Sequence, residues 1–170
     1  MRARRRWFGA LAGALVALAG PAALAVESDP LPVPKGSPRE QGVVAYNDGV
    51  KLMLEKRYPA AQAKFEEALA RFEGLAEAHN NLAFSLRMQG AQNAGRALKH
   101  YDRAIELKPD LAVAYVYRGV LFTQQGELRR AAEDHARLLK LDRALAAKLE
   151  AVITRRALSE GNAGLAAQYE

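Results

Sequence analysis

An internal period of 34 to 36 residues constrains the fold of this 170-residue chain more than any other feature. Small residues recur in register, 34 and 36 residues apart, at Gly49, Ala83 and Gly119. An apolar stretch and a turn follow each of them, and a further amphipathic segment then carries a second set at Ala61, Ala97 and Ala131. Two helical segments in every period predict stacked helical hairpins, because one hairpin alone cannot bury its apolar side.

The sequence Lys108-Pro109-Asp110 marks the end of one hairpin and the start of the next. Proline cannot continue a helix and disfavours helical backbone in the residue before it, yet an apolar-rich segment resumes almost at once. The middle copy is two residues longer, and the additional residues fall in its turn at 88–95, where an insertion disturbs no core. We therefore expect three helix–turn–helix units, at 42–75, 76–111 and 112–143.

The period, the paired helices and the small residues resemble the tetratricopeptide repeat (TPR) family over residues 42–143. The third copy carries the family pattern of aromatic, small, apolar and turn positions most fully, at Tyr115, Gly119, Phe122, Gly126, Ala131 and Leu138. Glu73 and Arg143 depart from it, because the family has a boundary proline there. The resemblance implies an all-α fold, an α-solenoid of three TPR units plus a C-terminal capping helix and tail at 144–170. Apolar residues support this last helix, at Leu145, Leu149, Val152 and Ile153.

The N-terminus has the layout of a secretory signal peptide. Four arginines precede an apolar stretch at 7–20, and the small-x-small sequence Ala23-Leu24-Ala25 follows it. We expect cleavage after residue 25, which predicts an exported protein of the bacterial periplasm or a secreted one. The apolar stretch is shorter than the roughly 20 residues of a spanning helix, so a membrane anchor is expected only if the signal stays uncleaved. The four prolines within 26–41 predict a Pro-rich disordered linker.

Charge argues against a nucleic-acid partner. The whole chain has 25 basic and 19 acidic residues, a net charge of +6. Four basic residues and no acidic ones lie in residues 1–25, so the remainder carries 21 against 19, a net charge of +2. A nucleic-acid-binding domain would keep a strongly basic surface after cleavage. The chain also has no cysteine, so an exported domain of this kind must be stabilised by packing rather than disulfides.

Histidine, the usual metal ligand, occurs three times, as His79, His100 and His135. The last two lie in the second helices of neighbouring units, where they could come close to each other. A zinc site needs three or four ligands, and no third ligand accompanies this pair. We therefore expect no metal and no cofactor.

Catalytic motifs are also lacking, and we expect that the protein is not an enzyme. Adjacent carboxylates occur at Glu66-Glu67 and Glu133-Asp134. Neighbouring residues on a helix point in directions about 100° apart, so these acids are expected to lie on solvated faces rather than to act as a catalytic pair. No nucleophile-elbow, zinc-protease or phosphate-binding glycine sequence is present.

The resemblance implies a concave face, lined by the first helix of each unit, that binds a partner peptide or helix. The shared register assigns thirteen residues to it, at Val43, Tyr46, Val50, Met53, Asn80, Asn81, Phe84, Arg87, Met88, Val113, Val116, Val120 and Thr123. Chaperone-binding members hold a terminal carboxylate with charged and polar residues on this face. Only Asn81 fits that pattern here, which disfavours such a ligand.

The expected function is therefore that of a protein–protein interaction module, an adaptor or scaffold in the bacterial cell envelope. An apolar concave face favours a partner with an apolar or amphipathic segment. The alternative is a structural, self-associating subunit, whose groove is filled by its own tail or by the second copy of a homodimer.

Overall fold

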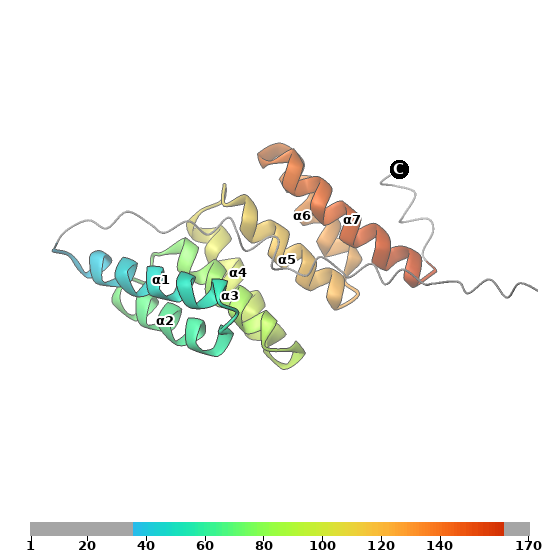
Figure 1. The fold of residues 1–170 in the computed structure, drawn as a ribbon. Coiled ribbons are helices and arrows are strands. Elements are labelled where there is room, and N and C mark those ends of the chain that lie inside the picture. Colours follow the sequence, from blue (N-terminus) through green and yellow to red (C-terminus); the bar gives the residue numbers. More distant parts are fainter. Residues whose placement is uncertain (1–35, 162–170) are drawn as a thin grey trace, which may run out of the picture.

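Helical hairpins form where the repeat pattern predicts them (Figure 1). This computed structural model describes residues 36–161, and no strand occurs among them. The hairpins are α1 (Pro38–Leu54) with α2 (Tyr58–Arg71), α3 (Ala76–Met88) with α4 (Ala94–Leu107), and α5 (Ala112–Gln124) with α6 (Leu128–Leu141). A short 3-10 helix, η3 (Ala91–Asn93), occupies the longer middle turn, and α7 (Arg143–Ser159) follows the third hairpin. The predicted all-α fold is confirmed.

Helix α1 begins at Pro38, earlier than the expected start of the first unit at residue 42. The prediction that this proline belongs to a non-helical linker is wrong, because a proline in the first helical turn loses no hydrogen bond. Ser37 caps the helix, and its hydroxyl accepts a hydrogen bond from the Glu40 amide at 3.3 Å. The rest of the predicted linker, at 26–35, lies outside the described residues, as does the predicted signal peptide at 1–25.

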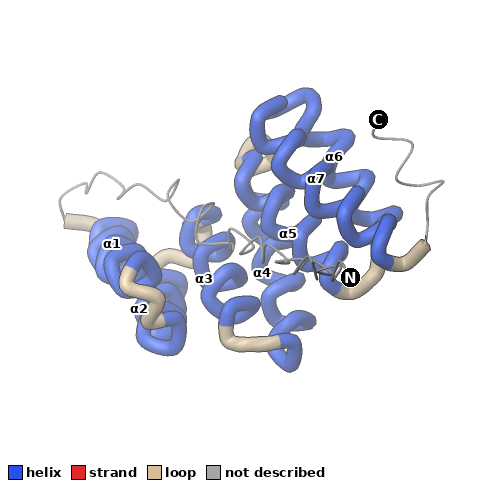
Figure 2. The backbone as a smooth tube through the Cα atoms, turned by 45° about the vertical axis from the view of Figure 1, so that its right-hand side comes forward, coloured by secondary structure: helices blue, strands red, loops and turns tan. Residues whose placement is uncertain are grey.

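The hairpins stack side by side as a solenoid (Figure 2). The first helices α1, α3, α5 and α7 contact one another in order, and each second helix also contacts the first helix that follows it. Helix α7 packs against both α5 and α6, so it covers the apolar side of the last hairpin. The α-solenoid with a C-terminal capping helix is therefore confirmed.

Two glycines allow helices to approach closely. A Cβ atom at Gly49 would lie 2.6 Å from the ring of Phe65, on the second helix of the same hairpin. A Cβ atom at Gly119 would lie 2.5 Å from Leu149, which belongs to α7 rather than to α6. The small residue of the first unit thus serves packing within its hairpin, whereas that of the third admits the capping helix.

Aromatic side chains fill the space between the hairpins. Phe65 and Tyr101, at corresponding positions of the first two units, have no exposed surface. Between the second and third units, the rings of Phe84 and Tyr117 pack with their centroids 5.1 Å apart. Burial of rings of this size supplies much of the apolar stabilisation that a chain without disulfides needs.

None of the helices between residues 36 and 161 combines the length and the hydropathy that crossing a bilayer requires.

Candidate partner-binding face

The thirteen residues assigned to the concave face lie on α1, α3 and α5, as their shared register predicts. Eleven of them are buried, with between 1% and 8% of their surface exposed. Met88 and Val113 are the two that are only partly buried. The apolar members Tyr46, Val50 and Val116 belong to the main hydrophobic core. The assignment as a binding face stays a prediction, and the partly exposed members are the ones that a partner can reach without repacking.

Polar side chains on this face hydrogen-bond across helices. The amide of Asn80 donates to Asn81 at 3.0 Å, and the amide of Asn81 donates to the Tyr46 hydroxyl at 3.1 Å. All three side chains are buried, so these bonds compensate for the loss of water. Asn81 therefore links α3 to α1 in this structure.

Arg87 is the one charged side chain among the thirteen predicted face residues, and only 8% of its surface is exposed. Its Nη1 lies 3.5 Å from the side-chain oxygen of Gln124 on α5. Its guanidinium also lies over the Phe84 ring, 5.3 Å from the centroid. These contacts place a positive charge between the second and third hairpins.

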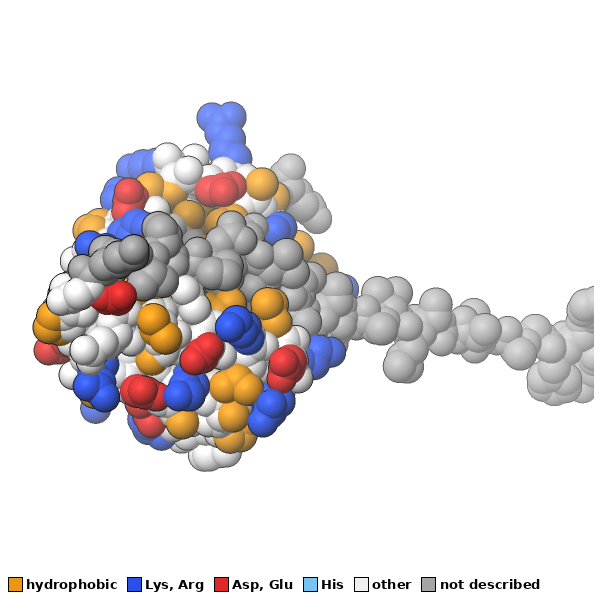
Figure 3. All heavy atoms as spheres, turned by 60° about the vertical axis from the view of Figure 1, so that its left-hand side comes forward, with side chains coloured by type: hydrophobic (Ala, Val, Ile, Leu, Met, Phe, Trp, Pro, Cys, Tyr) orange, Lys and Arg blue, Asp and Glu red, His pale blue; other side chains and the backbone are white. Residues whose placement is uncertain are grey.

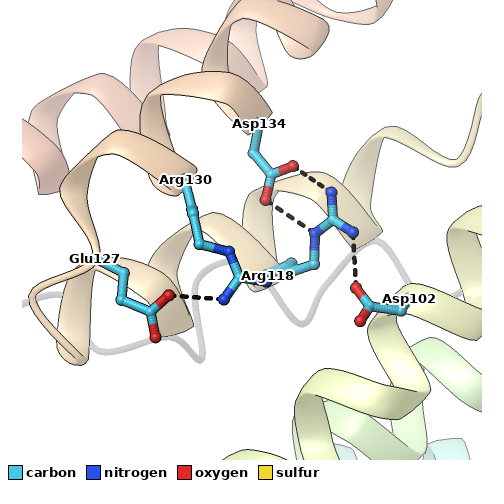
Figure 4. A network of polar contacts seen from close by, with 5 residues as sticks. All are labelled: Asp102, Arg118, Glu127, Arg130 and Asp134. Atoms are coloured by element: carbon cyan, nitrogen blue, oxygen red, sulfur yellow. Dashed lines mark hydrogen bonds and ion pairs between the residues drawn. The ribbon is translucent and has the colours of Figure 1, made fainter.

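A partly buried ion-pair network centred on Arg118 joins three helices (Figure 4). Arg118 on α5 donates from Nε and Nη2 to Asp134 on α6, at 3.1 and 2.6 Å, and from Nη1 to Asp102 on α4 at 2.7 Å. The Asp134 side chain is only 3% exposed. Burial disfavours the charged guanidinium, but hydrogen bonds and charge from the two aspartates outweigh it and raise the pKa of Arg118. The guanidinium therefore stays charged and holds α4, α5 and α6 together.

The expectation that Glu133-Asp134 lies on a solvated face is wrong for its second residue. Glu133 is exposed, whereas Asp134 points to the interior because it is rotated by about 100° around the helix. Glu66 and Glu67 are both exposed, as expected. Each carries a surface ion pair, Glu66 with Arg96 at 3.2 Å and Glu67 with Lys64 at 2.8 Å.

The histidines pair differently from the sequence expectation. His79 and His100 face each other, with their Nδ1 atoms 2.9 Å apart and their rings stacked at 5.2 Å, whereas His135 lies 3.5 Å from Glu150. The Nε2 of His79 donates to the Glu73 carbonyl at 3.1 Å, so its Nδ1 is the acceptor of the pair. Burial, together with the charge of His79, lowers the pKa of His100 to about 4, and burial lowers that of His79 too.

This arrangement makes the histidine pair neutral near pH 7. Two ring nitrogens in direct contact leave no room for a metal ion between them. Among the side chains of residues 36–161, no group of three or more histidine, cysteine or acidic residues is placed to hold one.

The face that carries α1 and α2 has mixed rather than segregated charges. On the side of α1 and α2, basic and acidic side chains alternate with apolar ones (Figure 3). Lys108 and Glu77 form another such pair at 2.9 Å. Surfaces that bind nucleic acid instead gather lysine and arginine on one side. The expected absence of a nucleic-acid partner stays a prediction.

Two hollows of the described surface bear on possible binding, one of them at the predicted face. One, of about 280 Å³, is lined by Arg87, Gly90, Ala91, Ala94, Leu121, Gln124 and Gln125. The other, of about 530 Å³, lies along α7 and is lined by Ala147, Glu150, Ala151, Thr154, Arg155 and Leu158. Sequence periodicity alone could not reveal the first, because it depends on how α3, the middle turn, α4 and α5 meet.

Stacked hairpins with close-packed small residues define a helical-repeat protein of the TPR-like type. Three solved structures share this fold. They are MamA (TM-score 0.67, 20% identical, covering 78% of this chain and 75% of that one), the TPR domain of Arabidopsis OM64 (0.65, 19%, 70% and 98%), and the second TPR of Spaghetti (RPAP3) bound to the HSP90 peptide SRMEEVD (0.58, 24%, 61% and 94%).

Curated relatives point to the same class of protein. The chain is 36% identical over 98 residues to Tetratricopeptide repeat protein 36 of Xenopus tropicalis, which covers 55% of this chain and 48% of that protein. It is 36% identical over 84 residues to the mitochondrial import receptor subunit TOM70 of Homo sapiens, covering 49% of this chain and 14% of that protein. The chain thus spans less than half the length of each. No protein-family model matches the sequence.

A further relative is named as an enzyme. The chain is 36% identical over 84 residues to a probable peptide N-acetylglucosaminyltransferase, SPINDLY of Solanum lycopersicum, covering 46% of this chain and 9% of that protein. Because so small a part of the enzyme matches, the likeness carries no catalytic residue to this chain. That the protein is not an enzyme stays a prediction.

Proposed function

We propose that this protein is an exported adaptor of the bacterial cell envelope, which binds a segment of another protein along the face formed by α1, α3 and α5. The observation that carries the proposal is the stack of three hairpins whose first helices contact one another in order. Such a layer presents side chains from several units to one elongated partner.

Similar proteins bind peptides with this architecture. Two TPR domains of Spaghetti (RPAP3) that share the fold were solved with an HSP90 peptide, and TOM70 is named as an import receptor subunit. Here the predicted face carries mainly apolar side chains together with Asn80, Asn81 and Arg87. The partner proposed is therefore an amphipathic segment, whose apolar side packs on the helices while its polar groups meet these residues.

Location in the envelope rests on the sequence of residues 1–25. An arginine-rich start, an apolar stretch and a small-x-small end are the parts of an export signal. The intact mass of the protein recovered from cells tests this step. A chain beginning at Val26 supports export with cleavage, and a chain beginning at Met1 contradicts it.

Site-specific crosslinking tests the proposed face. A photo-crosslinking amino acid at Met88 or Val113, the partly exposed members of the face, should capture one discrete partner in cells. The same amino acid at Leu139, which is 49% exposed on the second helix α6, is the matched control. Capture that is equally strong from position 139 would show that the partner does not use the layer of first helices.

Self-association is a second candidate, favoured by one observation on α7. Leu158 is 58% and Val152 36% exposed, and Leu158 borders the hollow of about 530 Å³. Apolar surface at the end of a solenoid suits a second copy of the chain. Mass measured by light scattering across a dilution series separates the candidates, with Leu158→Glu expected to abolish a dimer and Leu139→Glu to leave it intact. A monomer at every concentration would exclude this function.

A further inference from the structure

Arg87 is a buried cation with much of its hydrogen-bonding capacity unused. Within the described part of the chain, its Nε and Nη2 atoms have no close hydrogen-bond partner, and its side chain forms no ion pair with an acidic one. Its contact with Gln124 involves only Nη1 and is long, at 3.5 Å. The neutral Tyr101 hydroxyl is the other polar neighbour of Arg87. An uncompensated charge at such a position is costly, so the site favours binding an anion.

The unused nitrogens are the pair that binds a carboxylate best. Arg118 presents the same two nitrogens, Nε and Nη2, to both oxygens of Asp134, at 3.1 and 2.6 Å. The two parallel bonds of this arrangement fit the spacing of a carboxylate. Arg87 thus has the geometry that the chain itself uses for carboxylate binding, without an acid to fill it among residues 36–161.

The Tyr101 hydroxyl adds a further buried donor near Arg87. Apart from Arg87, this hydroxyl has no hydrogen-bond partner among the described residues. Burial raises the pKa of the hydroxyl to about 12, and the charge of Arg87 and a hydrogen bond with its side chain act in the opposite direction. The hydroxyl therefore keeps its proton at neutral pH and remains able to donate.

The fold does not require an arginine at this position. In the shared register, Arg87 corresponds to Met53 in the first unit and Thr123 in the third, and both of these are 2% exposed. Thr123 satisfies its own hydroxyl by donating to the Gly119 carbonyl at 2.8 Å. A neutral side chain therefore fills the same place in the other two units, which argues for a role of Arg87 outside packing.

A pocket adjoins this side chain. The hollow of about 280 Å³ is lined by Arg87 and by residues of the middle turn, α4 and α5, and Arg87 is the only charged residue that lines it. Gly90 and Ala91, which belong to the longer turn of the second unit, form part of its wall. The insertion thus shapes a pocket with a single positive charge.

We propose that this pocket binds the carboxylate of an acidic side chain in a partner segment, through Arg87. The proposal rests on the proposed function, because the partner segment is the one that would lie along the face of α3 and α5. Asn80, Phe84 and Arg87 follow one another along α3, so a segment lying there reaches the pocket with a side chain while its main chain continues. An aspartate or glutamate is therefore the expected group, rather than a chain terminus.

Nuclear magnetic resonance of arginine side chains tests the site without the unknown partner. The full chain is titrated with N-acetyl-glutamate amide, whose only carboxylate is that of the side chain, at constant ionic strength maintained with chloride. The Nε–H signal of Arg87, identified by its loss in Arg87→Met, should shift and saturate. The Nε–H signal of Arg118 is the internal control and should not move, because Asp134 already occupies it.

Two variants separate the site from a structural role. Arg87→Met should fold with unchanged or higher thermal stability. It should weaken binding of the probe at least about tenfold, because the loss of a charge-assisted pair is of that order. The Gln124 side-chain amide signal reports binding in this variant. Arg129→Gln, which removes an exposed arginine of α6, should bind like the parent. Unfolding of Arg87→Met, or equal binding by it, would overturn the proposal.

The remaining outcomes are also decisive. No saturable shift of the Arg87 signal would overturn the carboxylate site, even if crosslinking confirms a partner on the face. Binding of N-acetyl-alanine, whose only carboxylate is terminal, in preference to N-acetyl-glutamate amide would overturn the assignment to an acidic side chain. A saturable Arg87 shift without any crosslinked partner would instead support the pocket and contradict the proposed function.

Discussion

The ion pair between Arg118 and Asp134 is expected to be the most sensitive polar contact of the fold. Arg118→Met leaves the Asp134 carboxylate, which is 3% exposed, without its partner. Loss of one member of a buried pair costs about 3–5 kcal/mol of unfolding free energy, and this variant should lie in that range. Asp134→Leu should cost less, about 2–3 kcal/mol, because the Arg118 side chain is 20% exposed and keeps Asp102 as a partner.

The double variant should recover much of this loss. With both charges gone, neither group is left unpaired, so Arg118→Met with Asp134→Leu should lie within about 1–2 kcal/mol of the parent. The coupling energy from the complete cycle is then about 3–7 kcal/mol. Unfolding in urea, followed by circular dichroism at pH 7, gives each free energy.

A surface pair provides the matched control. Lys64 and Glu67 lie 2.8 Å apart on one helix, with 40% and 45% of their side chains exposed. Their coupling should be far smaller than that of Arg118 and Asp134, because water competes with the pair. A coupling between Arg118 and Asp134 as small as that of this control would refute the view that this buried pair stabilises the third hairpin.

Three further measurements test separate parts of the structure. The pKa of His100 is lowered from 6.5 to about 4, so between these pH values the unfolded chain binds a proton that the folded protein excludes. The free energy of unfolding should therefore fall by up to about 3 kcal/mol as the pH drops from 6.5 towards 4. His100→Gln should flatten this part of the pH profile, and an unchanged profile would contradict the assignment. Gly119→Ala should destabilise by about 1–3 kcal/mol, since its Cβ would meet Leu149 at 2.5 Å. Gly95→Ala, with no atom within 4 Å, should be neutral or stabilising, and equal thermal melting of the two alanine variants would refute the packing argument. The Asp142 side chain caps α7 by accepting hydrogen bonds from two backbone amides, at 2.8 and 3.0 Å. Asp142→Ala should therefore lower the free energy of unfolding in urea by about 1 kcal/mol, and an unchanged free energy would show that the cap is dispensable.

The repeat pattern predicted the elements that depend on local periodicity. Gly49, Ala83 and Gly119 fall on first helices of the three hairpins, and the Lys108-Pro109-Asp110 boundary lies between α4 and α5. These predictions are confirmed because each unit repeats the same pattern of small, apolar and turn residues, so three copies in register support the same assignment. The start of α1 was also encoded, since Ser37 followed by Pro38 is a helix-start signal, but the run of prolines before it favoured a linker.

Contacts between units were beyond a reading of the sequence. The pairing of His79 with His100, and the burial of Asp134 against Arg118, depend on rotation of helices relative to one another. Periodicity gives the face of a helix only to within about one residue. An error of one residue is enough to confuse an exposed acid such as Glu133 with a buried one such as Asp134. The same limit applies to the predicted binding face, where the register gave the right helices but not the burial of eleven of its thirteen residues.

The Arg118 network also makes the two ends of the solenoid mechanically unequal. It joins the second and third hairpins through Arg118 and Asp102, whose side chains are 20% and 43% exposed. The ion pairs Glu66–Arg96 and Glu73–Arg103, which join the first and second hairpins, have side chains that are 41% to 77% exposed. The first hairpin also has a neighbour on one side only among the described helices. If force is applied to the two ends of the folded chain, α1 and α2 should unfold first, and α3 to α7 should remain folded as an intermediate.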